Sequence, residues 1–196
     1  MRYFVIVLLV AAAAFALDFH PALDTMLTEL DIVFAYDTTG SMGEHYNFRS
    51  VCGYITERLE SEGIDCRYGL ACFGDGVRLS DFDTLCDGFQ LTDARDRFIN
   101  KLNTTGHSGG GDGPECFLDA LCAAGFEYEF DLSRPRIVVG ESDIQYHYLG
   151  DGTPYSFVTP AMVYDLFIGP GVPVFSIYDC WTTKHYDFIE TLSVNS

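Results

Sequence analysis

The feature that most constrains the fold is an alternation of short, continuous apolar runs with segments of helical periodicity. Apolar runs without a polar residue at every second position are typical of parallel strands buried on both faces. The segments between them place apolar residues at steps of three and four, the spacing of a helix with one buried face. The expected class is therefore α/β, in three layers, with a mostly parallel central sheet and helices on both faces.

Element boundaries follow from the same patterns and from the positions of Gly and Pro. Residues 76–82 are expected to pair back on the second strand as a hairpin, which gives the sheet one short antiparallel edge strand. A helix is expected to open at Pro114, because Pro and the following Glu115 suit a first helical turn. The other strands are expected at 30–37, 66–75, 134–143 and 172–179, and the other helices at 48–59, 93–102, 160–168 and 184–192.

The N-terminus has the pattern of a secretory signal peptide. A single Arg precedes an apolar stretch that ends in Ala14-Phe15-Ala16, an A-x-A type of cleavage site. The stretch is shorter than the roughly 20 residues that a membrane helix needs, so we expect no membrane span. We therefore expect residues 1–16 to be removed, and a secreted, extracellular protein with a single domain over residues 17–196.

The charge of the chain bears on the class of partner. There are 11 Lys plus Arg residues against 29 Asp plus Glu, a formal net charge of −18. Nucleic acid and anionic membrane surfaces are disfavoured as partners, because both are themselves negatively charged. The charge suits a soluble extracellular protein, or one that attracts cations.

The chain has seven cysteines, all beyond the signal sequence. In an oxidising compartment we expect most of them to form disulfide bonds, with one thiol left over. The sequence does not choose among the possible pairings, and an intermolecular disulfide through Cys180 is one hypothesis. Asn103-Thr104-Thr105 is a sequon for N-glycosylation and fits a secreted glycoprotein.

The stretch DIVFAYDTTGSM, residues 31–42, ends a buried strand in a carboxylate, hydroxyls and a glycine. The i, i+2, i+4 spacing of Asp37, Thr39 and Ser41 lets alternate side chains of a tight turn point to one spot. Hard oxygen ligands of this kind suit Mg²⁺, with Mn²⁺ or Ca²⁺ as further candidates. In an open α/β sheet, ligands bind at this end of the strands.

Two further acids are expected at the same edge of the sheet. Asp112 follows three glycines just before a helix, and Asp143 ends the strand RIVVGES. Simpler interpretations exist, because Asp112 suits a helix N-cap and Asp143 a turn, while Thr39 and Ser41 could cap the next helix. Taken together at three strand ends, the five residues favour a divalent-metal site.

The motifs DTTGSM, YGLACFGD, GGGDGPE followed by LDAL, and RIVVGESD stand in this order. Together they resemble those of von Willebrand factor A (vWA) domains, from about residue 29 to about residue 192. The GGGDxPE loop is most similar to that of hemicentin-type extracellular matrix proteins. The resemblance implies a secreted module for cell adhesion or matrix interaction, with a metal-ion-dependent adhesion site (MIDAS).

The resemblance also implies roles for single residues. The family's DxSxS motif matches Asp37, Thr39 and Ser41, its second-loop ligand falls on Asp112, and its third-loop aspartate falls on Asp143. By analogy the two hydroxyls bind the metal directly and some of the carboxylates act through water. A carboxylate of an extracellular protein partner would complete the shell.

The chain departs from the family pattern at several positions. Asp112 replaces a neutral hydroxyl, which should strengthen cation binding and weaken the attraction for an acidic ligand. Glu141 and Ser142 stand where the family usually has an apolar residue and Thr. The sequence also ends before the last strand and helix that the family commonly has, so we expect no allosteric opening through a closing helix.

Two other functions are alternatives to the binding module. A structural extracellular vWA domain would keep the fold and leave the metal site unused. A metal-dependent phosphohydrolase of the haloacid dehalogenase type has a DxDGT motif, and Thr39 stands where its second acid is required. We therefore expect a protein that is not an enzyme.

Overall fold

The computed structural model describes residues 27–42, 48–80, 89–108, 110–111, 113–178 and 183–195. The predicted signal peptide lies outside the described residues, and so do the predicted ligand Asp112 and the cysteines Cys86 and Cys180. No helix in the described part of the chain is long and apolar enough to cross a membrane.

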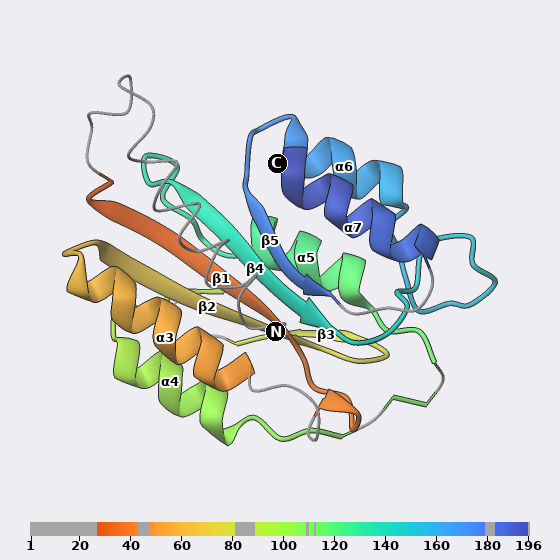
Figure 1. The fold of residues 1–196 in the computed structure, drawn as a ribbon, viewed down its shortest axis with the longest axis horizontal. Coiled ribbons are helices and arrows are strands. Elements are labelled where there is room, and N and C mark those ends of the chain that lie inside the picture. The colour runs from red at the N-terminus through yellow and green to blue at the C-terminus, as the bar shows by residue number, and fades with distance from the viewer. Residues whose placement is uncertain are drawn as a thin grey trace.

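A five-stranded sheet forms the centre of the molecule, with the strand order β3-β2-β1-β4-β5 (Figure 1). Four strands run parallel, and β3 pairs antiparallel with β2 at one edge. The mostly parallel sheet with one antiparallel edge strand is the arrangement that the sequence predicted. The strands are β1 (Glu29–Asp37), β2 (Asp65–Phe73), β3 (Val77–Leu79), β4 (Arg136–Ser142) and β5 (Val174–Tyr178).

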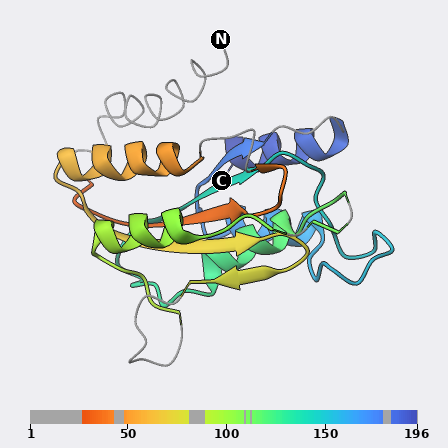
Figure 2. The ribbon, with the colours of Figure 1, turned by 90° about the horizontal axis from the view of Figure 1, so that it is seen from below.

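Helices cover both faces of this sheet. Figure 2 shows α3 and α5 on opposite sides of the strands. Helices α3 and α4 pack with one hydrophobic core and α5 and α6 with the other, while α7 lies against β5. The helices are α3 (Phe48–Ser61), α4 (Arg95–Thr104), α5 (Phe117–Phe126), α6 (Pro160–Ile168) and α7 (Thr183–Asn195).

The central strand β1 explains why its sequence is continuously apolar. Ile32 and Phe34 point into the core on the α3 side, whereas Val33 and Ala35 point into the core on the α5 side. Because successive side chains of a strand alternate between faces, a strand buried on both faces has no position for a polar residue along its middle. This confirms the predicted three-layer arrangement.

The start of α5 differs from the prediction. The helix begins at Phe117, not at Pro114. The amide of Glu115 donates to the carbonyl of Gln145 at 2.8 Å, and Glu115 forms an isolated parallel bridge with Tyr146. These backbone groups bond to a loop that is distant in sequence, so residues 114–116 lie outside the helix.

The cysteines also differ from the expectation. No disulfide joins any two of the five cysteines that the structure describes. Cys52, Cys66 and Cys72 are buried within the core on the α3 side, where they pack as small apolar side chains. Burial raises the pKa of the Cys66 and Cys72 thiols to about 11, which keeps them protonated. The expectation that most cysteines pair is therefore not met in this part of the chain.

Candidate metal site

The candidate site lies at the carboxyl ends of β1 and β4. These strands are neighbours, yet β1 is joined along the chain to β2 on its other side. The connections that leave β1 and β4 therefore diverge, which is the arrangement in which open α/β sheets bind their ligands. β1 ends at Asp37 and β4 ends at Ser142, immediately before Asp143.

Asp37 is fully buried, and three hydrogen bonds fix its carboxylate. Oδ1 accepts from the amide of Thr39 at 2.9 Å and from the Thr39 hydroxyl at 2.7 Å. Oδ2 accepts from the hydroxyl of Ser142 at 2.8 Å. Thr39 lies two residues after Asp37 in the chain. Hydrogen bonds over this spacing are the local pattern in which an Asp side chain stabilises a turn.

The contacts continue outward from Asp37. The hydroxyl oxygens of Thr39 and Ser41 lie 3.3 Å apart, and Ser41 Oγ donates to Asp143 Oδ1 at 3.3 Å. Adjacent ligands of an octahedral Mg²⁺, each about 2.1 Å from the ion, would be roughly 3.0 Å apart. The spacings of these oxygens fit that coordination shell. Four of the five predicted site residues thus lie in one chain of contacts.

The hydroxyls are oriented in a way that suits a cation. Thr39 donates its proton to Asp37, and Ser41 donates to Asp143. A hydroxyl that donates its proton keeps its oxygen lone pairs for another partner. Among the described residues, no group of three or more His, Cys, Asp or Glu side chains could hold a metal ion. The candidate ligand set therefore depends on hydroxyl oxygens, and these favour a hard cation.

The loop that contains Asp112 approaches the site. Asp112 itself lies outside the described residues, whereas residues 110–111 and 113 beside it are described. The amide of Ser108 donates to the carbonyl of Thr38 at 2.8 Å, and the amide of Gly111 donates to Asp75 Oδ2 at 3.1 Å. Gly110 has φ +82°, and a Cβ added there would lie 2.9 Å from Glu115 Oε1. Glycine suits this position, because a side chain is strained at this positive φ and its Cβ would displace the Glu115 carboxyl group.

The electrostatics of the site are dominated by negative charge. Burial raises the pKa of Asp37, the bonds from Thr39 and Ser142 oppose that rise, and the charge of Asp143 adds to it. Burial, and then the charges of Asp37 and Asp143, raise the pKa of Glu141 to about 9. Within the described residues, no basic side chain forms an ion pair with Asp37 or Glu141. The site is short of positive charge.

Sequence reasoning missed two residues of this site. Ser142 holds Asp37, and Glu141, the residue before it in β4, adds a buried carboxyl whose pKa is raised by the charges of Asp37 and Asp143. Glu141 is buried, and its Oε2 has no hydrogen-bond partner in the described structure. In the sequence both residues stand out only as departures from the family pattern. An acid at the end of an otherwise apolar strand was the signal that could have found Glu141.

The strand order, the covering helices and the oxygen-lined strand ends define a vWA-like fold. No protein-family model and no curated protein matches the sequence of this chain. The fold assignment therefore relies on the solved structures that resemble it.

Among solved structures, the chain is similar to proximal thread matrix protein 1 (PTMP1) from the mussel byssus. The TM-score is 0.57 at 15% identity, over 83% of this chain and 39% of that one. A PTMP1 structure with a zinc-occupied MIDAS motif gives a TM-score of 0.59 at 15% identity, with the same coverage of both chains. The conserved hypothetical protein BatB from Bacteroides thetaiotaomicron gives 0.51 at 13% identity, over 75% of this chain and 65% of that one.

These similarities confirm the vWA-like fold that the sequence predicted. The identities are too low to carry over more than the fold, and this chain spans about two fifths of the PTMP1 chain. The zinc-occupied MIDAS motif is a property of the PTMP1 structure. A closer relation to hemicentin-type domains stays a prediction.

Proposed function

We propose that this chain is a secreted binding module that holds a protein partner through a divalent cation. The observation that carries the proposal is the unbroken chain of oxygens from Asp37 through Thr39 and Ser41 to Asp143, with separations of 2.7, 3.3 and 3.3 Å. The zinc-occupied MIDAS motif of PTMP1, in a similar fold, supports it. The signal-peptide pattern supports secretion.

Four described residues would hold the ion: Asp37, Thr39, Ser41 and Asp143. Asp112, in the adjoining loop, is proposed as the fifth. The cation would neutralise the buried charge of Asp37 and offer a coordination position to a carboxylate of the partner. We propose Mg²⁺ as the ion, with Mn²⁺ or Ca²⁺ as alternatives, and adhesion or matrix interaction as the context.

We propose no catalytic role for this site. Thr39, which stands where a phosphohydrolase of the DxDGT type needs its second acid, cannot act as a general acid or base at neutral pH. The remaining alternative is a structural domain whose site binds no metal.

The first test is thermal unfolding of the protein with increasing Mg²⁺ or Mn²⁺. An ion that binds the native state at about 100 times its Kd adds about 2.7 kcal/mol of stability, so the melting temperature must rise. Ser41→Ala should abolish the rise and leave the metal-free melting temperature unchanged, because Ser41 is exposed.

Ser61→Ala, at the exposed end of α3, is the matched control and should respond to metal as the wild type does. A wild type without any shift would favour the structural alternative. An equal shift in wild type and Ser41→Ala would place the ion elsewhere.

The second test identifies the partner. The immobilised protein should capture an extracellular protein in Mg²⁺ and release it in EDTA, and immobilised Ser41→Ala should capture none. A partner that is retained in EDTA would contradict a metal-dependent contact.

A further inference from the structure

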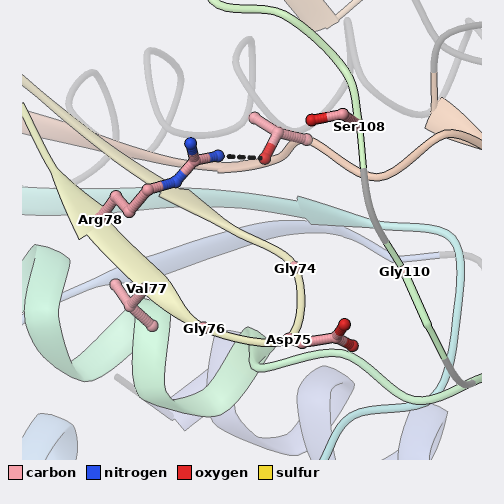
Figure 3. Close-up of a pocket in the computed structure, with 8 residues that line it drawn as sticks. Gly74, Asp75, Gly76, Val77, Arg78, Ser108 and Gly110 are labelled. Carbon is pink, nitrogen blue, oxygen red and sulfur yellow. Dashed lines mark hydrogen bonds between the residues drawn. The ribbon is translucent and has the colours of Figure 1, made fainter.

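A shallow pocket lies between the turn that joins β2 to β3 and the loop after α4 (Figure 3). Its volume is about 280 Å³. Thr38 and Gly110 line it, and a Cβ added to Gly110 would lie 3.5 Å from the Cβ of Thr39. The pocket therefore adjoins the candidate metal site. Its other lining residues are Gly74, Asp75, Gly76, Val77, Arg78 and Ser108.

Arg78 is the basic residue in this lining, and its side chain is exposed. One guanidinium nitrogen, Nη2, donates to Thr38 Oγ1 at 3.2 Å, as the dashed line in Figure 3 marks. Within the described residues, no carboxylate forms an ion pair with Arg78, whereas Arg67 and Arg134 both pair with Asp31. A guanidinium has five N–H donors, and within the described residues one donor of Arg78, on Nη2, bonds to a side chain.

Asp75 is the acidic residue of the lining. Its Oδ2 accepts a hydrogen bond from the amide of Gly111 at 3.1 Å, and this bond links the β2–β3 turn to the loop after α4. Figure 3 shows Asp75 at the opposite end of the pocket from Arg78. Within the described residues the two side chains form no ion pair, so the Arg78 guanidinium carries its charge at its own end of the pocket.

We propose that Arg78 binds a second carboxylate of the same partner whose first carboxylate completes the shell of the metal ion. This proposal rests on the proposed function and specifies the partner as a segment with two acidic side chains. A guanidinium matches a carboxylate with two parallel hydrogen bonds. In a chain of net charge −18, the ion and Arg78 would be two adjacent positive points at one edge of the sheet.

The probes are capped peptides with an Asp at each end of a glycine spacer, made in a series of spacer lengths. Matched peptides carry Asn in place of the second Asp. Calorimetric titration with Mg²⁺ at saturation measures their affinity for the full chain. At the spacer length that spans both points, the second Asp should tighten binding about tenfold, the range of one charge-assisted hydrogen bond.

Arg78→Gln should remove this tenfold difference. Glutamine can still donate to Thr38, so the fold should be kept. Arg58→Gln removes the same charge from an exposed position on α3 and should leave the difference intact.

The outcomes separate the two proposals. If one-Asp peptides bind in Mg²⁺ and a second Asp adds nothing at any spacer length, the Arg78 contact is wrong and the metal-dependent function stands. If the two-Asp peptide binds equally in EDTA and is weakened by Arg78→Gln, the Arg78 contact stands and the metal proposal fails. If no peptide binds in Mg²⁺, both proposals fail.

Discussion

Strand β1 carries two fully buried aspartates, one near each end, and their surroundings differ. At the amino end, Asp31 accepts from Arg67 Nε at 2.8 Å and from Arg134 Nε at 3.1 Å. At the carboxyl end, Asp37 accepts from an amide and two hydroxyls, all of them neutral groups. The two aspartates are equally buried in the same strand. Asp31 is bonded to two arginines, whereas Asp37 is bonded to no basic side chain within the described residues.

The difference indicates what each end is for. Desolvation of a buried carboxylate costs several kcal/mol unless an opposite charge compensates it. At the amino end two arginines of the chain supply that positive charge, so Asp31 has a structural role. At the carboxyl end burial, and then the charge of Asp143, raise the pKa of Asp37, and burial, with the charges of Asp37 and Asp143, raises the pKa of Glu141. We infer that this end is suited to an added cation.

The largest effect is expected when both arginines of Asp31 are replaced. In Arg67→Met/Arg134→Met the carboxylate stays buried without a cation, so the free energy of unfolding should fall by about 3–5 kcal/mol. Urea unfolding measures the loss, and Mg²⁺ should not restore it. Adding Asp31→Asn should recover part of the stability. A double variant as stable as the wild type would show that this end does not need its arginines.

Glu141→Gln should change how stability depends on pH. The folded-state pKa of Glu141, about 9, lies above its ordinary value of 4.5, so its contribution to stability is complete below pH 4.5 and is lost as the pH rises toward 9. Gln stays neutral, so the variant should be more stable by about 1–3 kcal/mol near pH 9 and similar to the wild type near pH 4. Urea unfolding at both pH values, without metal, measures this difference. Parallel pH profiles of variant and wild type would contradict it.

Asp37→Asn should have the smallest effect on the metal-free protein. The raised pKa of Asp37 means that its charge is unfavourable there, so the variant should be up to ~1 kcal/mol more stable at pH 7. The Asn oxygen can still accept from Thr39, and the Ser142 hydroxyl can turn to accept from the new amide. The matched change Asp31→Asn should lower stability, because it weakens the bonds to two arginines. Equal signs for the two variants would break the comparison.

The fold was predictable because it depends on patterns that lie within single segments. The apolar run of β1 and the periodicity of the helices are local, and the structure contains them close to the expected positions. The start of α5 was not predictable, because Glu115 bonds to the backbone of Gln145 and His147, thirty residues further along the chain. Bonds of this kind leave no pattern within one segment.

The site shows the same division. Asp37, Thr39 and Ser41 form a local motif, and their closeness to Asp143 followed from the general rule about strand ends. The roles of Ser142 and Glu141 depend on which residues of β4 lie opposite those of β1, and the sequence does not give this register. Arg78 gave no signal, because its importance comes from the pocket around it. Asp112 lies outside the described residues and stays a prediction.

The register between β1 and β4 has a consequence for folding. Tyr36 lies opposite Glu141, and this alignment brings the hydroxyl of Ser142 to Asp37. A slip of one residue would send Ser142 to the other side of the sheet, because neighbouring side chains alternate. A chain with misaligned strands would keep its helices but would not bind the ion. Cation affinity would therefore report the correct pairing of β1 with β4, which circular dichroism cannot detect.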